Sequence, residues 1–436
     1  MTGISAILAE FATEPLAVSD RSRDIIRLSL MDWAACAIAG AEEPVSRICR
    51  DMVLAEGSTG VSVLIGGGVV SARAAALANG ATSHALDFDD THFLHIGHPS
   101  VVVFSAALAM AQEVSSSGAD FLEAAALGFE ASARIGAWLG RGHYETGFHQ
   151  TATAGSFGAT LACGRLMGLN VDQMQHALGI CATRARGLKS QFGTMGKPYN
   201  AGLAAANAVE ATLLAARGFM SRPDGLECVQ GFGDTHVGAG DMSALAGLGK
   251  TWVTDSVSHK FHACCHGTHA ALEALRIAAD GLPSGQVSAV QIWTNPRWAR
   301  VCNIAEPMTG LEAKFSYRMT AAMALLGRDT GRADQFEDAV CSNPRACALS
   351  EKVSVEFVQD VAETAAKVVV TDIRGAAQVA TFDLAEPLPI EALEQRLAAK
   401  LSGLVGAEKA CKLAQASSAM STAKNLGDFA AILAGE

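Results

Sequence analysis

The sequence predicts a mainly α-helical protein with an α+β part. Three observations predict this fold class. Apolar residues recur at helical spacing through the first 250 residues, segments with alternating polarity begin after that point, and helical spacing returns from Pro389 onward. We therefore expect a large all-helical domain formed from both chain ends, residues 1–250 and 389–436, and a smaller inserted α+β domain, residues 251–388.

Glycine and proline mark the expected helix ends in the first part. The helix at Arg23–Ala39 stops at Gly40, and Pro44 opens the next helix, where a first-turn proline costs no hydrogen bond. Ser71 caps an alanine-rich helix running toward Leu86, whereas Val61–Ser71 predicts a small hairpin around three consecutive glycines. Further helices are expected at 100–114, 120–139, 151–167, 171–185 and 198–216.

The inserted domain combines strands and helices. β-Branched residues alternate with polar ones in four segments, which favours strands at 287–294, 353–358, 367–372 and 378–384. Helical spacing predicts helices at 267–279, 312–326, 389–404 and 422–433.

Composition excludes several classes of protein. Of the 436 residues, 50% are hydrophobic and 18% are charged, which excludes a disordered chain. The net charge of −11 makes nucleic acid a poor partner. No apolar stretch is long enough to cross a bilayer and no leader is recognised, so we expect no membrane partner. The 11 scattered cysteines suit reduced thiols in the cytoplasm. Dinucleotide, phosphate-loop and nucleophile-elbow motifs are absent from the sequence.

The densest polar segment runs from His84 to His98. It carries three aspartates and four histidines between two very apolar helices. Asp87 and Asp89 could orient a neighbouring imidazole or raise its pKa. They could instead bind a divalent cation together with histidines, although no further acidic cluster completes such a site. The plainest alternative is a helix end with solvated acids.

Two further segments combine a charged or titratable side chain with a helix start. Lys197 directly precedes Pro198, and a lysine at a helix N-terminus can bind a carboxylate, although most lysines are simply solvated. His149 precedes an alanine- and glycine-rich helix, where a histidine is more often a cap than a functional group.

The inserted domain carries two more candidates. Four histidines, a lysine and two thiols lie between His259 and His269, but the adjacent Cys264 and Cys265 lack the two-residue gap of a zinc knuckle. Tyr317 is either a core aromatic residue or a donor to a carboxylate.

These segments, in this order, resemble the MmgE/PrpD family, which includes 2-methylcitrate dehydratase, cis-aconitate decarboxylase and iminodisuccinate epimerase. The resemblance covers nearly the whole chain. It rests on five motifs: His-x-Leu-Asp-Phe-Asp-Asp-Thr followed by His-Pro-Ser, Gly-Phe-His, Lys-Pro before the Gly-x-Ala-Ala helix, Lys-x-x-Ala-Cys-Cys-His-x-x-His and Glu-Ala-Lys-Phe-Ser-Tyr.

The resemblance implies a helical domain with a smaller α+β lid, a homodimer, and an active site between the domains that needs no organic cofactor. We also expect no bound metal. Matched residue by residue, it implies catalytic roles for Asp87, His98, His149, Lys197, His266 and Tyr317. It implies substrate contacts from Thr91, Lys260 and Cys265. Two departures stand out: the spacer between Thr91 and His98 is one residue longer than in the decarboxylase pattern, and Cys265 takes the place of a lid histidine.

The implied chemistry is proton transfer at a carbon next to a carboxylate of a small di- or tricarboxylate. We expect His98 to act as base or acid with Asp87 orienting it, and Lys197 and Lys260 to meet the developing charge. His149, His266 or Tyr317 would move the second proton. A dehydratase-type lyase is expected. Cys265 favours an epimerase of a dicarboxylate such as iminodisuccinate over a decarboxylase. A non-catalytic binding scaffold and a metal-dependent lyase, with Asp87, Asp89 and histidines on one ion, are the remaining alternatives.

Overall fold

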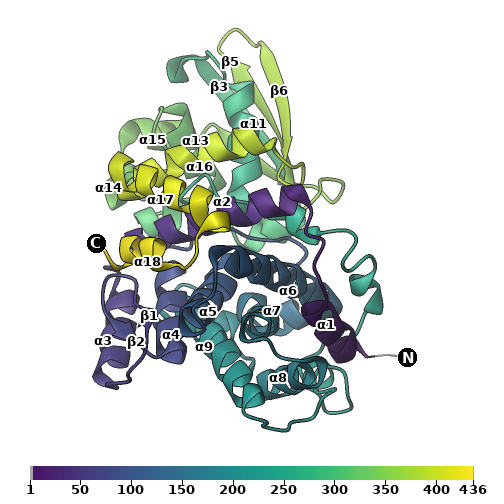
Figure 1. The fold of residues 1–436 in the computed structure, drawn as a ribbon. Helices are drawn as coiled ribbons and strands as arrows, with labels where there is room; N and C mark the ends of the chain where they lie inside the picture. Colours follow the sequence, from purple (N-terminus) through teal and green to yellow (C-terminus); the bar gives the residue numbers. More distant parts are fainter. Residues whose placement is uncertain (1–2, 436) are drawn as a thin grey trace. The chain divides into compact units, whose positions relative to one another are not determined.

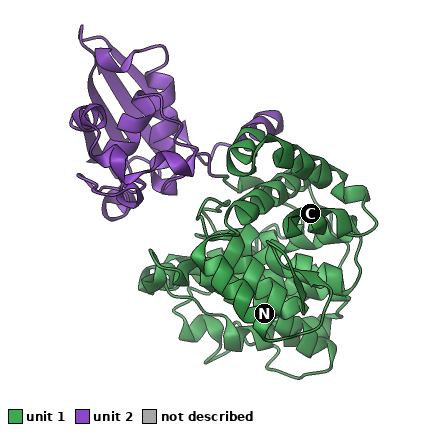
Figure 2. Cartoon of the chain, turned by 90° about the vertical axis from the view of Figure 1, so that its left-hand side faces the viewer, with its two compact units in different colours: residues 1–259, 397–436 green, residues 260–396 purple. Residues whose placement is uncertain are grey.

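The chain forms two compact units. The computed structural model describes residues 3–435, and Figure 2 shows the units in different colours. The described parts of 1–259 and 397–436 make up the helical unit, and residues 260–396 make up the α+β unit. The predicted fold class, mainly α with an α+β part, is confirmed.

The helical unit contains most of the helices and one short hairpin. The hairpin, expected around the three glycines, pairs β1 (Ser62–Val63) with β2 (Val69–Val70). The helices of the N-terminal segment are α1 (Ile4–Thr13), α2 (Asp20–Ala39), α3 (Pro44–Ala55), α4 (Ala72–Ser83), α5 (Pro99–Glu113), α6 (Gly118–Thr146), α7 (Gln150–Met167), α8 (Val171–Arg184), α9 (Gly196–Ala216) and α10 (Phe232–Thr235).

Helix α7 lies at the centre of the helical unit. Every residue from Gln150 to Gly164 is buried, because small or apolar side chains cover nearly all of the helix surface. Helices α5, α6 and α9 pack against it, as Figure 1 shows. Because His149 directly precedes α7, this packing fixes the position of one candidate site residue.

Helices α4 and α9 approach each other at a pair of glycines. A Cβ atom on Gly202 would lie 2.2 Å from the carbonyl oxygen of Leu77, and one on Gly80 would lie 2.8 Å from Cα of Gly202. Helix α4 leads into the polar segment and α9 begins beside Lys197. This contact therefore sets the separation between two parts of the candidate site.

The C-terminal segment completes the helical unit. Its helices are α16 (Ile390–Val405), whose first residues belong to the α+β unit, α17 (Ala407–Ala419) and α18 (Gly427–Ala434). Helices α17 and α18 pack against α2. The buried Lys400 on α16 pairs with Asp32 at 2.6 Å and donates to the carbonyl oxygen of Phe88 at 2.6 Å. The chain end thus holds the backbone of the polar segment.

The α+β unit is built on a four-stranded sheet in the order β4-β3-β5-β6. The central β3 pairs in parallel with β4 and antiparallel with β5, and β5 pairs antiparallel with β6. Helix α11 packs against β5 and β6. The elements are α11 (His269–Ala278), β3 (Val287–Thr294), α12 (Gly310–Ala313), α13 (Tyr317–Leu325), α14 (Asp338–Cys341), α15 (Pro344–Ser350), β4 (Val353–Phe357), β5 (Ala365–Asp372) and β6 (Ala377–Asp383).

Two expected helices differ from the observed ones. The helix expected at 312–326 is divided into α12 and α13, because the side chain of Ser316 accepts from the Met319 amide and caps a new helix there. The amide of Tyr317 bonds to the carbonyl oxygen of Cys302 instead of continuing the first helix. The last helix begins at Gly427 rather than at Thr422, and α17, which was not predicted, lies before it.

None of the helices in the described part of the chain combines the length and apolar character that crossing a bilayer requires.

The close contact of α4 with α9 makes Gly202→Ala destabilising. The added methyl group would overlap the Leu77 carbonyl, so we expect the free energy of unfolding to fall by about 1–3 kcal/mol. Gly142→Ala, on an exposed position of α6 with no neighbouring atom closer than 4.0 Å, is the matched control and should be neutral or slightly stabilising. Thermal and urea unfolding measure both variants. Equal stability of the two would contradict the close approach.

Candidate active site

The polar segment connects α4 to α5 and brings its own two ends together. His84 is the residue after α4, and His98 is the residue before Pro99, which starts α5. The segment folds back between them through turns that place Asp87 and Ile96 at positive φ, 50° and 53°. The imidazole rings of His84 and His98 consequently lie 4.6 Å apart, centre to centre.

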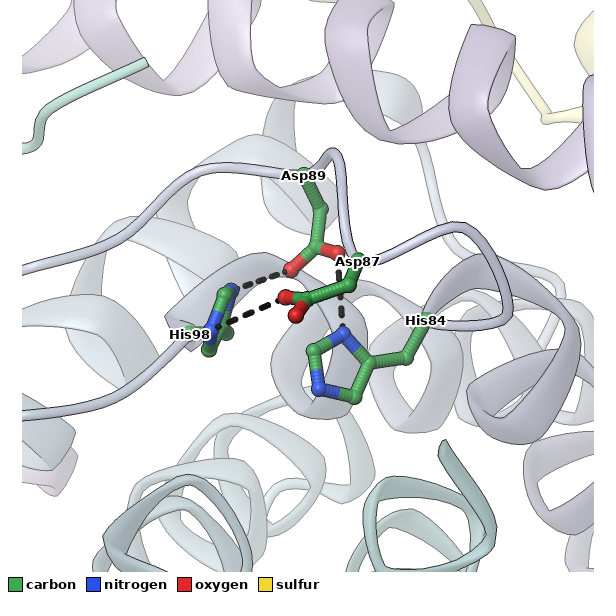
Figure 3. Close-up of side chains that lie close together, drawn as sticks. All are labelled: His84, Asp87, Asp89 and His98. Carbon is green, nitrogen blue, oxygen red and sulfur yellow. Dashed lines mark hydrogen bonds and ion pairs between the residues drawn. The ribbon is translucent and has the colours of Figure 1, made fainter. Parts of the chain in front are cut away.

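Asp89 lies between these two imidazoles, as Figure 3 shows. Nδ1 of His84 donates to one carboxylate oxygen at 2.9 Å, and Nδ1 of His98 donates to the other at 2.7 Å. Asp89 is completely buried. Burial alone would raise the pKa of Asp89, but the two imidazoles hold it well below its usual value. The carboxylate is therefore ionised at neutral pH.

A second carboxylate, Asp87, joins His98 to a lysine from another helix. Nζ of Lys197 lies 2.6 Å from Oδ2 of Asp87, and Nε2 of His98 lies 3.5 Å from Oδ1. Lys197 is in the first turn of α9, where the amide groups of the helix N-terminus add positive potential. Asp87 is the partly exposed member, with 42% of its side chain accessible. The site therefore offers a cation and an imidazole beside an accessible carboxylate.

His149 is a buried, neutral member of the same group. Its ring stacks on that of His84 at 6.1 Å, and Nδ2 of Asn200 donates to its Nδ1 at 3.4 Å. Burial lowers the pKa of His149 well below its usual value, and the charge of Lys197 lowers it further. Because Nδ1 accepts, its proton is on Nε2.

Three other polar residues of the segment bond to backbone groups outside it. Nε2 of His95 bonds to the carbonyl oxygen of Gln150 at 3.0 Å, and Nε2 of His92 bonds to that of Val253 at 2.8 Å. Asp90 accepts from the Ser100 amide at 3.2 Å in the first turn of α5. Burial raises the pKa of Asp90 to about 7, with the charge of Asp89 contributing.

The side chains of this cluster are close enough together to be considered as ligands of a metal ion. Ligand atoms of His84, Asp87, Asp89 and His98 all lie within 4.8 Å of one another, and this combination of nitrogen and oxygen atoms could suit a divalent cation. In the structure, however, the same atoms satisfy one another, and the ammonium group of Lys197 already lies against Asp87. The positive charge of Lys197, fixed beside Asp87, opposes the binding of a metal cation to the same carboxylate.

The other predicted site residues are Thr91 of the polar segment and four residues of the α+β unit. Thr91, also in the helical unit, pairs with Ser258 through two backbone hydrogen bonds of 2.8 Å. Lys260, Cys265, His266 and Tyr317 belong to the α+β unit.

Within the α+β unit, hydrogen bonds hold Tyr317 and Cys265. The hydroxyl of Tyr317 donates to the carbonyl oxygen of Gly267 at 2.7 Å and lies 3.2 Å from Oγ1 of Thr294, while burial raises its pKa. Sγ of Cys302 lies 3.0 Å from Sγ of Cys265. The ring of His266 contacts that of His269 at 4.6 Å.

Two residues at the centre of this cluster, His84 and Asp89, are not among the site residues that the sequence predicts. Both stand in the segment that the sequence marks as the densest in polar residues, and Asp89 was considered there as a group that could orient an imidazole. Their spacing of five residues gives no helical or strand periodicity, so only the turn reveals that they meet.

Comparison with known proteins identifies the family of this chain. The MmgE/PrpD N-terminal domain matches residues 6–245, and the MmgE/PrpD C-terminal domain matches residues 262–415. The chain belongs to the MmgE/PrpD family.

Among its relatives are proteins named cis-aconitate decarboxylase. One from Aspergillus terreus (strain NIH 2624 / FGSC A1156) is 33% identical over 293 residues, which cover 63% of this chain and 60% of that protein. One from Homo sapiens is 26% identical over 301 residues, covering 66% and 62%. The cis-aconitate decarboxylase-like protein oryM of Aspergillus oryzae (strain ATCC 42149 / RIB 40) is 31% identical over 294 residues, covering 62% and 61%. The chain thus matches about three fifths of the length of each relative.

The raised pKa of Asp90 predicts a pH-dependent gain in stability for Asp90→Asn. From about pH 4 to pH 7 the unfolded chain releases this proton while the folded protein keeps it, so the wild type loses stability as pH rises. The amide of the variant still accepts from Ser100 and does not titrate. The stability of Asp90→Asn relative to the wild type should therefore increase by up to about 1.4 kcal/mol per pH unit. Urea unfolding at pH 5 and 7.5 measures this, and a difference that does not change with pH would refute it.

Proposed function

We propose that the protein is a cofactor-independent lyase of the dehydratase or decarboxylase type, acting on a small di- or tricarboxylate. The observation that carries this proposal is the juxtaposition of Lys197, Asp87 and His98 at the N-terminus of α9. The names of the relatives, which refer to cis-aconitate, support a tricarboxylate.

The chemistry explains why this combination of groups is required. A proton on a carbon next to a carboxylate is very weakly acidic, so a base alone does not remove it. Negative charge develops on the carboxylate oxygens, and a preorganised cation must meet it. Lys197 supplies this charge with the help of the helix N-terminus. In this proposal a substrate carboxylate takes a place beside Lys197 that Asp87 now shares.

His98 is the proposed base. Its Nε2 faces the accessible Asp87, while its Nδ1–H is held by the buried Asp89. A histidine suits proton transfer near neutral pH. The position of Asp89 supports a division of roles in which Asp89 orients His98 and Asp87 positions Lys197.

A second group must then move the other proton. We propose His149, since it carries a proton on Nε2 and lies near Lys197 in the helical unit. His266 and Tyr317 stay as alternatives from the α+β unit. Thr91, Lys260 and Cys265 are the proposed substrate contacts, as the family resemblance implies.

An epimerase of a dicarboxylate such as iminodisuccinate is the second candidate function. It would return the proton to the opposite face of the same carbon. Cys265, which stands where the decarboxylase pattern has a histidine, favours it over decarboxylation. Also on the family resemblance, we propose a cytoplasmic homodimer, which light scattering of the purified protein tests.

Substitution of His98 or Lys197 should strongly reduce proton exchange at the carbon next to a substrate carboxylate. In D₂O with 2-methylcitrate, citrate, cis-aconitate, malate, tartrate and iminodisuccinate, proton NMR should show deuterium entering next to a carboxylate, or an alkene product. We expect His98→Ala to lower kcat by about 10²–10⁴-fold and Lys197→Ala by about 10²–10³-fold. Lys412→Ala, which alters an exposed lysine on α17, is the control and should retain full activity.

The product spectrum separates the two candidate functions. A new alkene or loss of CO₂ indicates a lyase, whereas deuterium uptake with only a change of optical rotation indicates an epimerase. The absence of turnover with every compound would favour a non-catalytic scaffold.

Removal of metal ions should leave the activity unchanged. Lys197 already provides the positive charge beside Asp87, so dialysis against EDTA is expected to keep kcat within about twofold, and elemental analysis should find no stoichiometric divalent metal. Activity that disappears with EDTA and returns with one divalent ion would show instead that the His84, Asp87, Asp89 and His98 cluster binds a metal.

A further inference from the structure

Asp89 has no contact with solvent, and both of its carboxylate oxygens accept hydrogen bonds. His84 takes one and His98 takes the other, each through Nδ1, at 2.9 Å and 2.7 Å. Figure 3 shows the carboxylate between the two rings. The carboxylate therefore restrains both imidazole rings, and each ring in turn restrains the carboxylate.

The fold fixes the carboxylate from the backbone side as well. Phe88, the residue before Asp89, is buried and its carbonyl oxygen accepts from Nζ of Lys400 at 2.6 Å. Lys400 is itself buried and paired with Asp32 on α2. The loop around Asp89 is thus anchored by the C-terminal segment, which leaves the side chain little freedom to rotate away from the imidazoles.

This arrangement determines the tautomer of both histidines. An ionised carboxylate can only accept, so both Nδ1 atoms must carry hydrogen. Neutral His98 then has its lone pair on Nε2, the atom that faces Asp87. Neutral His84 has its lone pair on a buried Nε2, which makes no hydrogen bond to any residue in the described part of the chain.

The two histidines differ in what their Nε2 atoms can reach. Nε2 of His98 lies beside the partly exposed Asp87 and so on the accessible side of the cluster. His84 is only 1% exposed, and its ring is enclosed by the rings of His98 and His149. His84 is therefore placed to hold Asp89 rather than to contact a substrate.

We infer that Asp89 and His84 form a positioning pair for His98: Asp89 holds the His98 ring in the tautomer whose lone pair is on Nε2, where it can accept a proton, and His84 holds Asp89 in place. When His98 becomes an imidazolium, its charge lies against the Asp89 carboxylate, which stabilises it. The catalytic consequence rests on the proposed function, whereas the tautomer does not.

The tautomer can be read without any substrate. In the full-length protein labelled with ¹⁵N-histidine, long-range proton–nitrogen NMR distinguishes Nδ1–H from Nε2–H rings, and His84→Asn and His98→Asn spectra assign the two signals. We expect Nδ1–H for both in the wild type, and an altered or mixed tautomer for His98 in Asp89→Asn. An Nε2–H form of His98 in the wild type would overturn the inference.

Kinetics test the catalytic consequence. Asp89→Asn should lower kcat by about 10²–10⁴-fold, with KM within about threefold, because the substrate contacts are intact. His84→Asn keeps a donor near the former Nδ1 position and should retain kcat within about fivefold, whereas His84→Leu removes the donor and should lose at least about tenfold. His143→Asn is the control for altering a buried histidine, since His143 bonds to His236 and Thr153 and not to this cluster.

The outcomes separate this inference from the proposed function. If the wild type turns over a compound but Asp89→Asn matches it in kcat, the positioning role is overturned and the proposed function survives. If no compound is turned over, the proposed function fails and the wild-type tautomers alone decide on the positioning role. If Asp89→Asn does not fold by circular dichroism, the His84→Asn and His84→Leu pair decides, and equal kcat in those two variants would overturn the inference.

Discussion

The ionised carboxylate of Asp89 can stay buried because two imidazole N–H groups donate to it, and the geometry of the candidate site depends on that interaction. A lone buried carboxylate would cost several kcal/mol or become protonated. Its neighbour Asp90, which lacks such donors, shows the second outcome, since its pKa is raised to about 7. The pKa values of two adjacent aspartates are therefore shifted in opposite directions, and the difference lies in their hydrogen-bond partners.

Positive charge is the second requirement of the site. The chain carries a net charge of −11, yet the anionic substrate that we propose needs a local cation. Lys197 provides it at the start of α9, and the close approach of α4 and α9 at Gly80 and Gly202 places that helix start near Asp87. The close packing of small residues between α4 and α9 thus also determines where the positive charge of the site lies.

Local sequence signals predicted most of the elements. Pro44 and Gly40 marked helix ends, the three glycines after Ile65 marked a hairpin, and alternation of β-branched residues marked β3 along its full length. The expectations that were wrong concern competition between local and distant bonds. Ser316 began a new helix because its side chain caps α13 and the Tyr317 amide bonds to Cys302, a partner that no local pattern contains.

The sequence by itself determined the class of fold, the family, and the segment that holds the candidate site, because periodicity, caps and motif order are local properties. The sequence could not show which aspartate bonds to which histidine. The meeting of Asp89 with His84 and His98, the pairing of Asp87 with Lys197, and the anchoring of Phe88 by Lys400 join residues separated by 5 to 312 positions. Only the tertiary structure decided these, because a hydrogen bond depends on distance in space and the chain turns back on itself in ways that spacing does not record.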